Sequence, residues 1–299
     1  MTKIVAGSMA SLMLLLATGT ANSADASGKA APQAQQQQQP QAQQQNGIKL
    51  LKEKPKVAPV PKKNSPNRII TNFNGDTKTQ MGFNWFTTDK AEDAQVWVST
   101  SKNMKDAKTF TAKAEQVDSQ YIERDQSGHF IFADVEKDDN GKTVKDENGK
   151  PKVKGYYTDK GAGGPEWTSG DQHGKASLTN VKEYNYKAQA TGLKPNTTYY
   201  YKVGSKKGKQ SQVGTFRTSG NAGDPFKFVQ YTDTQNAYWN EHVRNEAKFG
   251  ANTIAEAIKT AGNPNFALHT GDFVENSQVE DEWNDCLLYT SDAADDSLR

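Results

Sequence analysis

The sequence predicts a mixed fold, in which an all-β sandwich is followed by the first β-α-β unit of an α/β domain. This prediction rests on three patterns. Short segments rich in aromatic and β-branched residues, with alternating apolar and polar positions, fill the middle of the chain. A strand, an amphipathic helix and a second strand then follow one another. A polar region rich in Gln and Pro precedes both.

The first 67 residues show no pattern of a packed domain. Residues 1–23 carry an early lysine, an apolar stretch and a final Ala-Asn-Ser, which together predict a secretory signal peptide. An uncleaved signal anchor is the alternative, but the apolar stretch is shorter than the roughly 20 residues of a spanning helix, so we expect no integral membrane span. Residues 24–67, rich in Gln, Ala, Pro and Lys, predict a disordered linker that could contact an anionic cell wall.

Charge and cysteine content limit the partners and the compartment. The net charge of +2 over 299 residues indicates no nucleic-acid partner. Cys286 is the single cysteine, so the chain has no internal disulfide. With the signal peptide, these features predict a secreted or cell-surface bacterial protein.

Residues 68–222 carry the strand pattern of an antiparallel sandwich. The predicted strands lie within residues 81–88, 94–101, 109–117, 129–135, 184–205 and 211–219. Two Asn-Gly pairs within residues 138–155 predict hairpin turns in an inserted, exposed ribbon.

One short stretch of this region is more specific. The segment Leu193-Lys194-Pro195-Asn196-Thr197-Thr198-Tyr199 resembles the E–F corner of fibronectin type III domains, in which a leucine fills the core and a tyrosine packs at the start of the next strand. The segment TFRT at 215–218 is similar to the last strand of such a module. The resemblance implies a fibronectin III-like domain and says nothing by itself about activity.

Residues 225–284 predict the start of an α/β domain, with strands at 226–233 and 265–270 and a helix at 241–262. A β-α-β unit predicts parallel strands, so Asp233 and Asp272 should lie at the carboxyl ends of neighbouring strands. Two converging carboxylates repel each other unless a cation offsets the repulsion, and Fe, Mn, Zn or Mg would suit such oxygen ligands. The alternative is that each aspartate caps a turn or a helix.

The order strand-Asp-x-Gln, helix, strand-Gly-Asp is similar to the first two motifs of calcineurin-like metallophosphoesterases, and the preceding sandwich resembles that of purple acid phosphatases. The resemblance covers residues 68–284. It implies two divalent or trivalent metal ions (Fe, Mn or Zn), with Asp233 on the first and Asp272 bridging both. Gln235 stands where the family has a ligand histidine, and an amide oxygen is a poorer ligand than an imidazole.

Three further residues are expected to support this site. His269 would brace the Gly-Asp motif, and Asn276 follows that motif closely. Glu275 stands where purple acid phosphatases carry the tyrosine that gives their colour, so no charge-transfer colour is expected. The catalytic residues are unknown, because the family's later Gly-Asn-His and Gly-His-x-His motifs do not occur in this sequence.

The tail CLLYTSDAADDSLR resembles the translation of a transposon-type sequencing adapter. We therefore expect residues 285–299 to be an artefact and residues 225–284 to be a truncated phosphoesterase domain. A natural acidic tail is the alternative.

These patterns together predict a secreted, metal-dependent phosphoesterase that acts on a small phosphate-ester substrate at a two-metal site. A fragment without the later motifs is expected to be inactive. Two alternatives stay open: a cell-surface binding or adhesion module built on the sandwich, and a nucleotidase or phosphodiesterase of the same superfamily.

Overall fold

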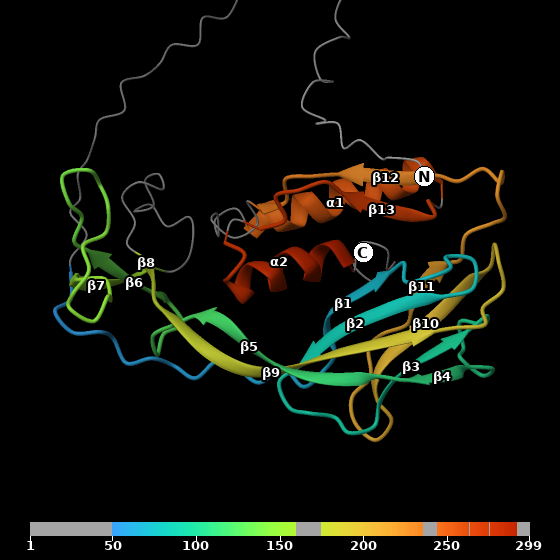
Figure 1. Ribbon diagram of the computed structural model, residues 1–299, viewed down its shortest axis with the longest axis horizontal. Coiled ribbons are helices and arrows are strands. Elements are labelled where there is room, and N and C mark those ends of the chain that lie inside the picture. The colour runs from blue at the N-terminus through green and yellow to red at the C-terminus, as the bar shows by residue number, and fades with distance from the viewer. Residues whose placement is uncertain (1–49, 160–174, 236–243, 263, 275, 292–299) are drawn as a thin grey trace, which may run out of the picture. The chain divides into compact units, whose positions relative to one another are not determined.

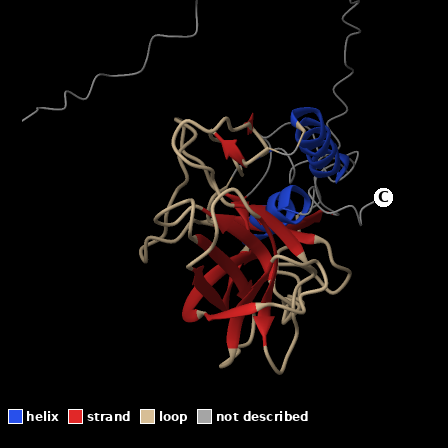
Figure 2. Ribbon diagram, turned by 90° about the vertical axis from the view of Figure 1, so that its right-hand side faces the viewer, coloured by secondary structure: helices blue, strands red, loops and turns tan. Residues whose placement is uncertain are grey.

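The computed structural model describes residues 50–159, 175–235, 244–262, 264–274 and 276–291. The chain divides into two compact units, Met1–Gln45 and Asn46–Arg299, and the first unit lies outside the described residues. The predicted signal peptide and residues 24–49 of the predicted linker lie outside them as well. No helix in the described ranges is both long and apolar enough to cross a membrane. Strands and loops make up most of what is described (Figure 2).

Two four-stranded antiparallel sheets form the sandwich (Figure 1). The first has the order β1 (Asn67–Asn72), β2 (Met81–Thr87), β9 (Leu178–Ala190), β5 (Lys113–Ile122). The second has the order β11 (Gly214–Arg217), β10 (Thr198–Ser205), β3 (Ala94–Ser99), β4 (Lys108–Thr111). The predicted sandwich is therefore confirmed. The predicted strand at 109–117 is instead two strands, β4 and β5, because the chain crosses from one sheet to the other at Ala112.

The core between the two sheets is aromatic. Trp85 stacks on Tyr186 within the first sheet, with ring centroids 5.3 Å apart. Phe83 meets Phe216 of the second sheet edge-on at 5.6 Å. Such aromatic contacts stabilise a core beyond the apolar area that they bury.

The corner between β9 and β10 has the predicted geometry. The Tyr199 hydroxyl accepts a hydrogen bond from the backbone N–H of Lys194 at 2.8 Å. Leu193 is buried in the core beside it. Asn196, at the tip of the turn, has a φ of 50°, a conformation that asparagine tolerates better than most residues.

The strand that the sequence predicts at 129–135 is present but lies outside the two sandwich sheets, in a third sheet that the sequence patterns did not predict. Its order is β7 (Val153–Asp159), β6 (Phe130–Val135), β8 (Lys175–Ala176). The predicted exposed ribbon leads into it, and Asp138 and Asp146 each begin one of its turns, where the carboxylate accepts hydrogen bonds from the backbone N–H groups two and four residues further on. A second apolar cluster forms around this sheet, made of Ile122, Phe130, Phe132, Tyr157 and Val279.

Residues 50–66 differ from the disordered linker that the sequence predicts. They follow a defined extended path, in which the backbone N–H of Ala58 donates to the carbonyl of Arg124 at 2.7 Å and that of Thr88 donates to the carbonyl of Lys63 at 2.9 Å. Proline favours such an extended backbone. The backbone groups of Arg124 and Thr88 hydrogen-bond to this segment and hold it along the sandwich.

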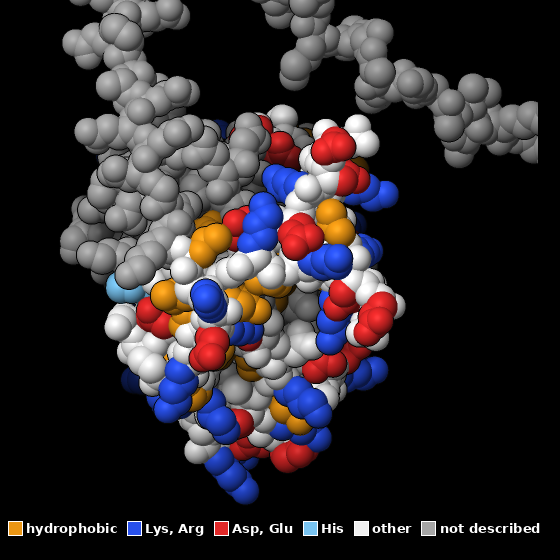
Figure 3. All heavy atoms as spheres, turned by 90° about the vertical axis from the view of Figure 1, so that its left-hand side faces the viewer, with side chains coloured by type: hydrophobic (Ala, Val, Ile, Leu, Met, Phe, Trp, Pro, Cys, Tyr) orange, Lys and Arg blue, Asp and Glu red, His pale blue; other side chains and the backbone are white. Residues whose placement is uncertain are grey.

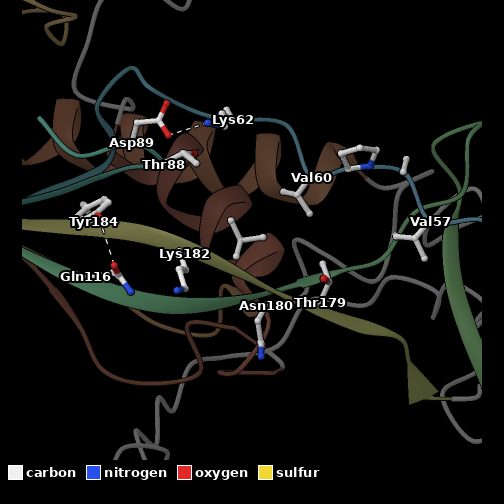
Figure 4. Close-up of a pocket in the computed structure, with 13 residues that line it drawn as sticks. Val57, Val60, Lys62, Thr88, Asp89, Gln116, Thr179, Asn180, Lys182 and Tyr184 are labelled. Atoms are coloured by element: carbon white, nitrogen blue, oxygen red, sulfur yellow. Dashed lines mark hydrogen bonds and ion pairs between the residues drawn. The ribbon is translucent and has the colours of Figure 1, made fainter.

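A groove of about 620 Å³ lies between this segment and strands β5 and β9 (Figure 4). It shares no residue with the strand ends that carry Asp233 and Asp272. On the face shown in Figure 3, Lys and Arg side chains are interspersed with Asp and Glu. That face therefore presents no field of one sign to an anionic polymer.

The β-α-β unit follows the sandwich. It consists of β12 (Phe228–Tyr231), α1 (Arg244–Ala261) and β13 (Phe266–His269), and the two strands pair in parallel as predicted. Ala251 and Ile254 on the apolar side of α1 are buried. Gly262 ends the helix with a φ of 64°, a left-handed conformation that glycine adopts without steric cost. The last element, α2 (Glu280–Ser291), was not predicted, and it crosses the boundary at which the adapter-like tail is expected to begin.

Candidate metal centre

Asp233 and Asp272 lie at neighbouring strand ends, as the β-α-β prediction requires. The backbone pairing of β12 with β13 continues past both strands, because the N–H of Thr270 donates to the carbonyl of Tyr231 and the N–H of Asp233 donates to the carbonyl of Gly271, each at 3.1 Å. Asp272 directly follows that last pair. The two carboxylates are therefore presented at the same edge of the sheet.

Both aspartates have a backbone conformation that is rare for their residue type. Asp233 has a φ of 60° and Asp272 a φ of 52°. A non-glycine residue in the left-handed region costs about 1–2 kcal/mol, although Asp and Asn tolerate it best. Strain of this kind clusters at functional sites, and here it falls on the two residues that the sequence singles out.

His269, the last residue of β13, is held by hydrogen bonds on both ring nitrogens. Its Nδ1 accepts from the backbone N–H of Gly271 at 3.3 Å, and its Nε2 lies 3.0 Å from the Thr234 hydroxyl. We assign the proton of the neutral ring to Nε2, because Nδ1 is an acceptor and the Thr234 hydroxyl donates onward to the carbonyl of Phe273 at 3.0 Å. The ring also stacks on Phe273, with centroids 3.5 Å apart.

The charge state of His269 follows from these surroundings. Burial lowers the pKa of His269 below its ordinary value, and the negative charges of Asp233 and Asp272 oppose this shift without cancelling it. The neutral ring is thus favoured near pH 7. Because both of its nitrogens are occupied, His269 holds the Gly-Asp turn through Gly271 and is not available as a ligand.

The side-chain amide of Gln235 bears on whether a metal ion fits this site. Its Oε1 is buried and has no hydrogen-bond partner among the described residues. A buried acceptor of this kind costs about 1–3 kcal/mol unless a ligand or an ordered water satisfies it. A cation bound by Gln235 together with Asp233 and Asp272 would satisfy it, and three side-chain oxygens are donors that such a cation takes, so these residues fit the start of a metal site.

The described residues do not complete such a site. Nowhere among them do three or more His, Cys, Asp or Glu side chains come together in a way that could hold a metal ion. Glu275 lies outside the described residues. Asn276 binds Glu282 of α2: its backbone N–H and its Nδ2 donate to the two carboxylate oxygens at 2.7 Å and 3.0 Å.

Sequence reasoning missed two residues that hold this region. Thr234 joins His269, Phe273 and the Cys286 sulfur through one hydroxyl, and nothing in the local sequence indicates that role. Glu282 lies in the run Glu280-Asp281-Glu282, and acidic residues in succession are a recognised helix-start signal that could have predicted α2.

The fold and the site define a class of chain: a β-sandwich in front of a parallel β-α-β unit that carries an aspartate at the end of each strand. The family model described as purple acid phosphatase, N-terminal domain, matches residues 66–218. These residues make up half of the chain and include every strand of the two sandwich sheets. The chain belongs to the purple acid phosphatase N-terminal domain family.

The proteins that are similar to this chain include an acid phosphatase and a purple acid phosphatase of known structure. An acid phosphatase from Aspergillus ficuum is 32% identical over 97 residues, which is 32% of this chain and 14% of that protein. The chain thus spans about a seventh of the length of this curated relative. The structure of a purple acid phosphatase from yellow lupin (Lupinus luteus) seeds matches with a TM-score of 0.44 and 16% identity over 77% of this chain and 34% of that one.

Proposed function

We propose that the protein to which this chain belongs is a secreted, metal-dependent phosphoesterase that hydrolyses phosphate esters. The observations that carry the proposal are two aspartates with strained backbone at neighbouring strand ends and, two residues after Asp233, a buried amide oxygen of Gln235 with no partner among the described residues. Membership of the purple acid phosphatase N-terminal domain family supports it, since the similar Aspergillus protein is an acid phosphatase. The signal-peptide pattern supports secretion.

Asp233, Asp272 and Gln235 would hold the first metal ion. When bound, a pair of such ions supplies Lewis-acid stabilisation of the phosphoryl oxygens and lowers the pKa of a bound water. The side chains of this chain have two tasks in that scheme. The two aspartates supply the negative charge that attracts the cation, and His269 and Thr234 keep the Gly-Asp turn in place.

The sharpest test is metal binding by the metal-free chain. Calorimetric titration with Zn²⁺ and with Mn²⁺ should show binding by the wild type, and Asp272→Asn should weaken it by at least about a hundredfold, because a charged ligand becomes neutral. Asp118→Asn is the matched control, because Asp118 is an exposed aspartate on β5. Equal binding by all three proteins would overturn the proposal and would favour a binding or adhesion module.

Turnover is a separate question from metal binding. We expect no hydrolysis of p-nitrophenyl phosphate by this chain, because its described residues supply too few ligands for two ions. In a longer protein that contains the complete site, the relative rates on a phosphomonoester and a phosphodiester would separate an acid phosphatase from a nucleotidase or phosphodiesterase.

A further inference from the structure

Helix α2 is attached to the sandwich by two of its first acidic residues. Glu280 forms an ion pair with Arg68 of β1, whose side chain is 1% exposed. Asp281 accepts a hydrogen bond from the backbone N–H of Ile122 at 2.7 Å and one from the Arg124 guanidinium at 3.3 Å. Charge-assisted hydrogen bonds like these are shorter and stronger than neutral ones.

Apolar contacts reinforce the same attachment. Val279, the residue before α2, is 5% exposed and belongs to the apolar cluster around the third sheet. Trp283 points back to the loop before the helix, where its Nε1 donates to the carbonyl of Ser277 at 3.1 Å and its ring lies 5.9 Å from that of Phe273. Helix, loop and sandwich are therefore packed together at this point.

Glu282 is the third acidic residue of the run and reaches a different partner. Its side chain is almost fully buried, and its two carboxylate oxygens accept from the backbone N–H and from the side-chain amide of Asn276. Consecutive residues on a helix point about 100° apart, so Glu280, Asp281 and Glu282 can each reach a different partner. Asn276 ends the loop that begins with Asp272. The start of this loop is fixed by the hydrogen bond from the backbone N–H of Gly271 to His269.

We propose that the sandwich positions the Asp272 loop through helix α2, with Glu282 as the positioning residue and with Glu280 and Asp281 as the attachments. The proposal rests on the proposed function only in the role that it gives to Asp272. A metal ligand must be held close to its binding geometry before the ion arrives, and residues behind the ligands commonly provide that support. This assigns to the sandwich a task in the phosphoesterase site that its fold alone does not reveal.

Hydrogen exchange of the metal-free full chain, followed by mass spectrometry, tests this directly. In Glu282→Ala the amides of residues 272–276 should exchange about tenfold faster, as expected for the loss of roughly one charge-assisted hydrogen bond. Glu282→Gln retains one acceptor oxygen and should lie between wild type and Ala. Asp281→Ala removes only the hydrogen bonds from α2 to Ile122 and Arg124 of the sandwich, and it should also speed exchange in this loop.

Two controls separate positioning from general destabilisation. Glu256→Ala removes an exposed glutamate of α1 and should leave the loop unchanged. Exchange in β2 and β9 reports global opening and should stay at the wild-type rate in every variant. If Glu282→Ala does not fold, Asn276→Ala removes the Nδ2 bond to Glu282 and keeps the backbone N–H bond, so it should speed exchange of the loop by less than tenfold.

Zn²⁺ titration of the same samples distinguishes the two proposals. Loop exchange that is unchanged in Glu282→Ala, or in Asn276→Ala where Glu282→Ala does not fold, overturns the positioning role, whether or not the wild type binds metal. Faster loop exchange in these variants, together with a wild type that binds no metal, would remove the proposed function and leave the positioning intact. Zn²⁺ binding that is weakened in Glu282→Ala and partly restored in Glu282→Gln supports both.

Discussion

Arg68 and Glu280 are 212 positions apart in the sequence, yet they form an ion pair between the first sandwich strand and the last helix. Arg68 also binds both oxygens of Glu183 at 2.9 Å, and its guanidinium lies 4.1 Å from the centre of the Phe86 ring. Burial lowers the pKa of Arg68, but its interactions with the carboxylates of Glu280 and Glu183 and with the Tyr121 phenol more than offset this, and the net shift is upward. The arginine thus stays charged in a buried position.

Removing this arginine should be costly, because two carboxylates would stay in a buried site without their partner. We expect Arg68→Met to lower the free energy of unfolding by about 3–5 kcal/mol, measured by urea denaturation with tryptophan fluorescence. Lys62→Met is the control, because Lys62 is 69% exposed in its pair with Asp89 and should contribute less than about 1 kcal/mol. Similar losses of unfolding free energy in the two variants would show that the buried ion pairs of Arg68 stabilise the fold no more than an exposed ion pair does.

The left-handed backbone at Asp272 predicts an unusual order of substitutions. Glycine adopts a φ near 52° without steric cost, so Asp272→Gly should be more stable than Asp272→Ala by about 1 kcal/mol in the metal-free chain. At Asp118, in the extended strand β5, the order should reverse. Thermal unfolding of the four variants measures this, and the same order at both positions would argue against strain at residue 272.

His269 predicts a loss of stability on acidification. Its folded-state pKa lies below the ordinary value of about 6.5, so the unfolded chain binds the proton more tightly. The stability that this residue contributes is therefore present above pH 6.5 and is lost as the pH falls from there through the lowered folded-state pKa. NMR titration of the imidazole in chelator should show a midpoint below 6.5, and a midpoint at or above that value would contradict the assignment.

Gln235 offers a gain-of-function test. Its buried Oε1 lacks a partner among the described residues, and an imidazole at this position is a stronger ligand for Zn²⁺ than an amide. We expect Gln235→His to tighten Zn²⁺ binding by about tenfold, equivalent to about 1.4 kcal/mol. Gln230→His, on the exposed side of β12, should not change the affinity. An equal effect at both positions would show only that any added histidine recruits the metal.

Local patterns were sufficient for much of the fold. Alternating apolar residues predicted the sandwich strands, and the segment from Leu193 to Tyr199 predicted a corner whose hydrogen bond is present. The β-α-β order predicted that Asp233 and Asp272 share one edge, because parallel pairing is a consequence of the helical crossover. These features depend on residues close together in the chain, where spacing and residue type are informative.

Other features needed the tertiary structure. The third sheet, the fixed path of residues 50–66 and the attachment of α2 depend on partners far away in the sequence. Arg68 and Glu282 give no local sign of their roles, since a charged residue is buried only where folding brings its counter-charge or hydrogen-bond partner to it. The sequence by itself determined most sandwich strands, the β-α-β unit and the two aspartates at its strand ends. Only the tertiary structure decided which residues hold the aspartate loop in place, because those contacts exist between segments that have no relation until the chain has folded.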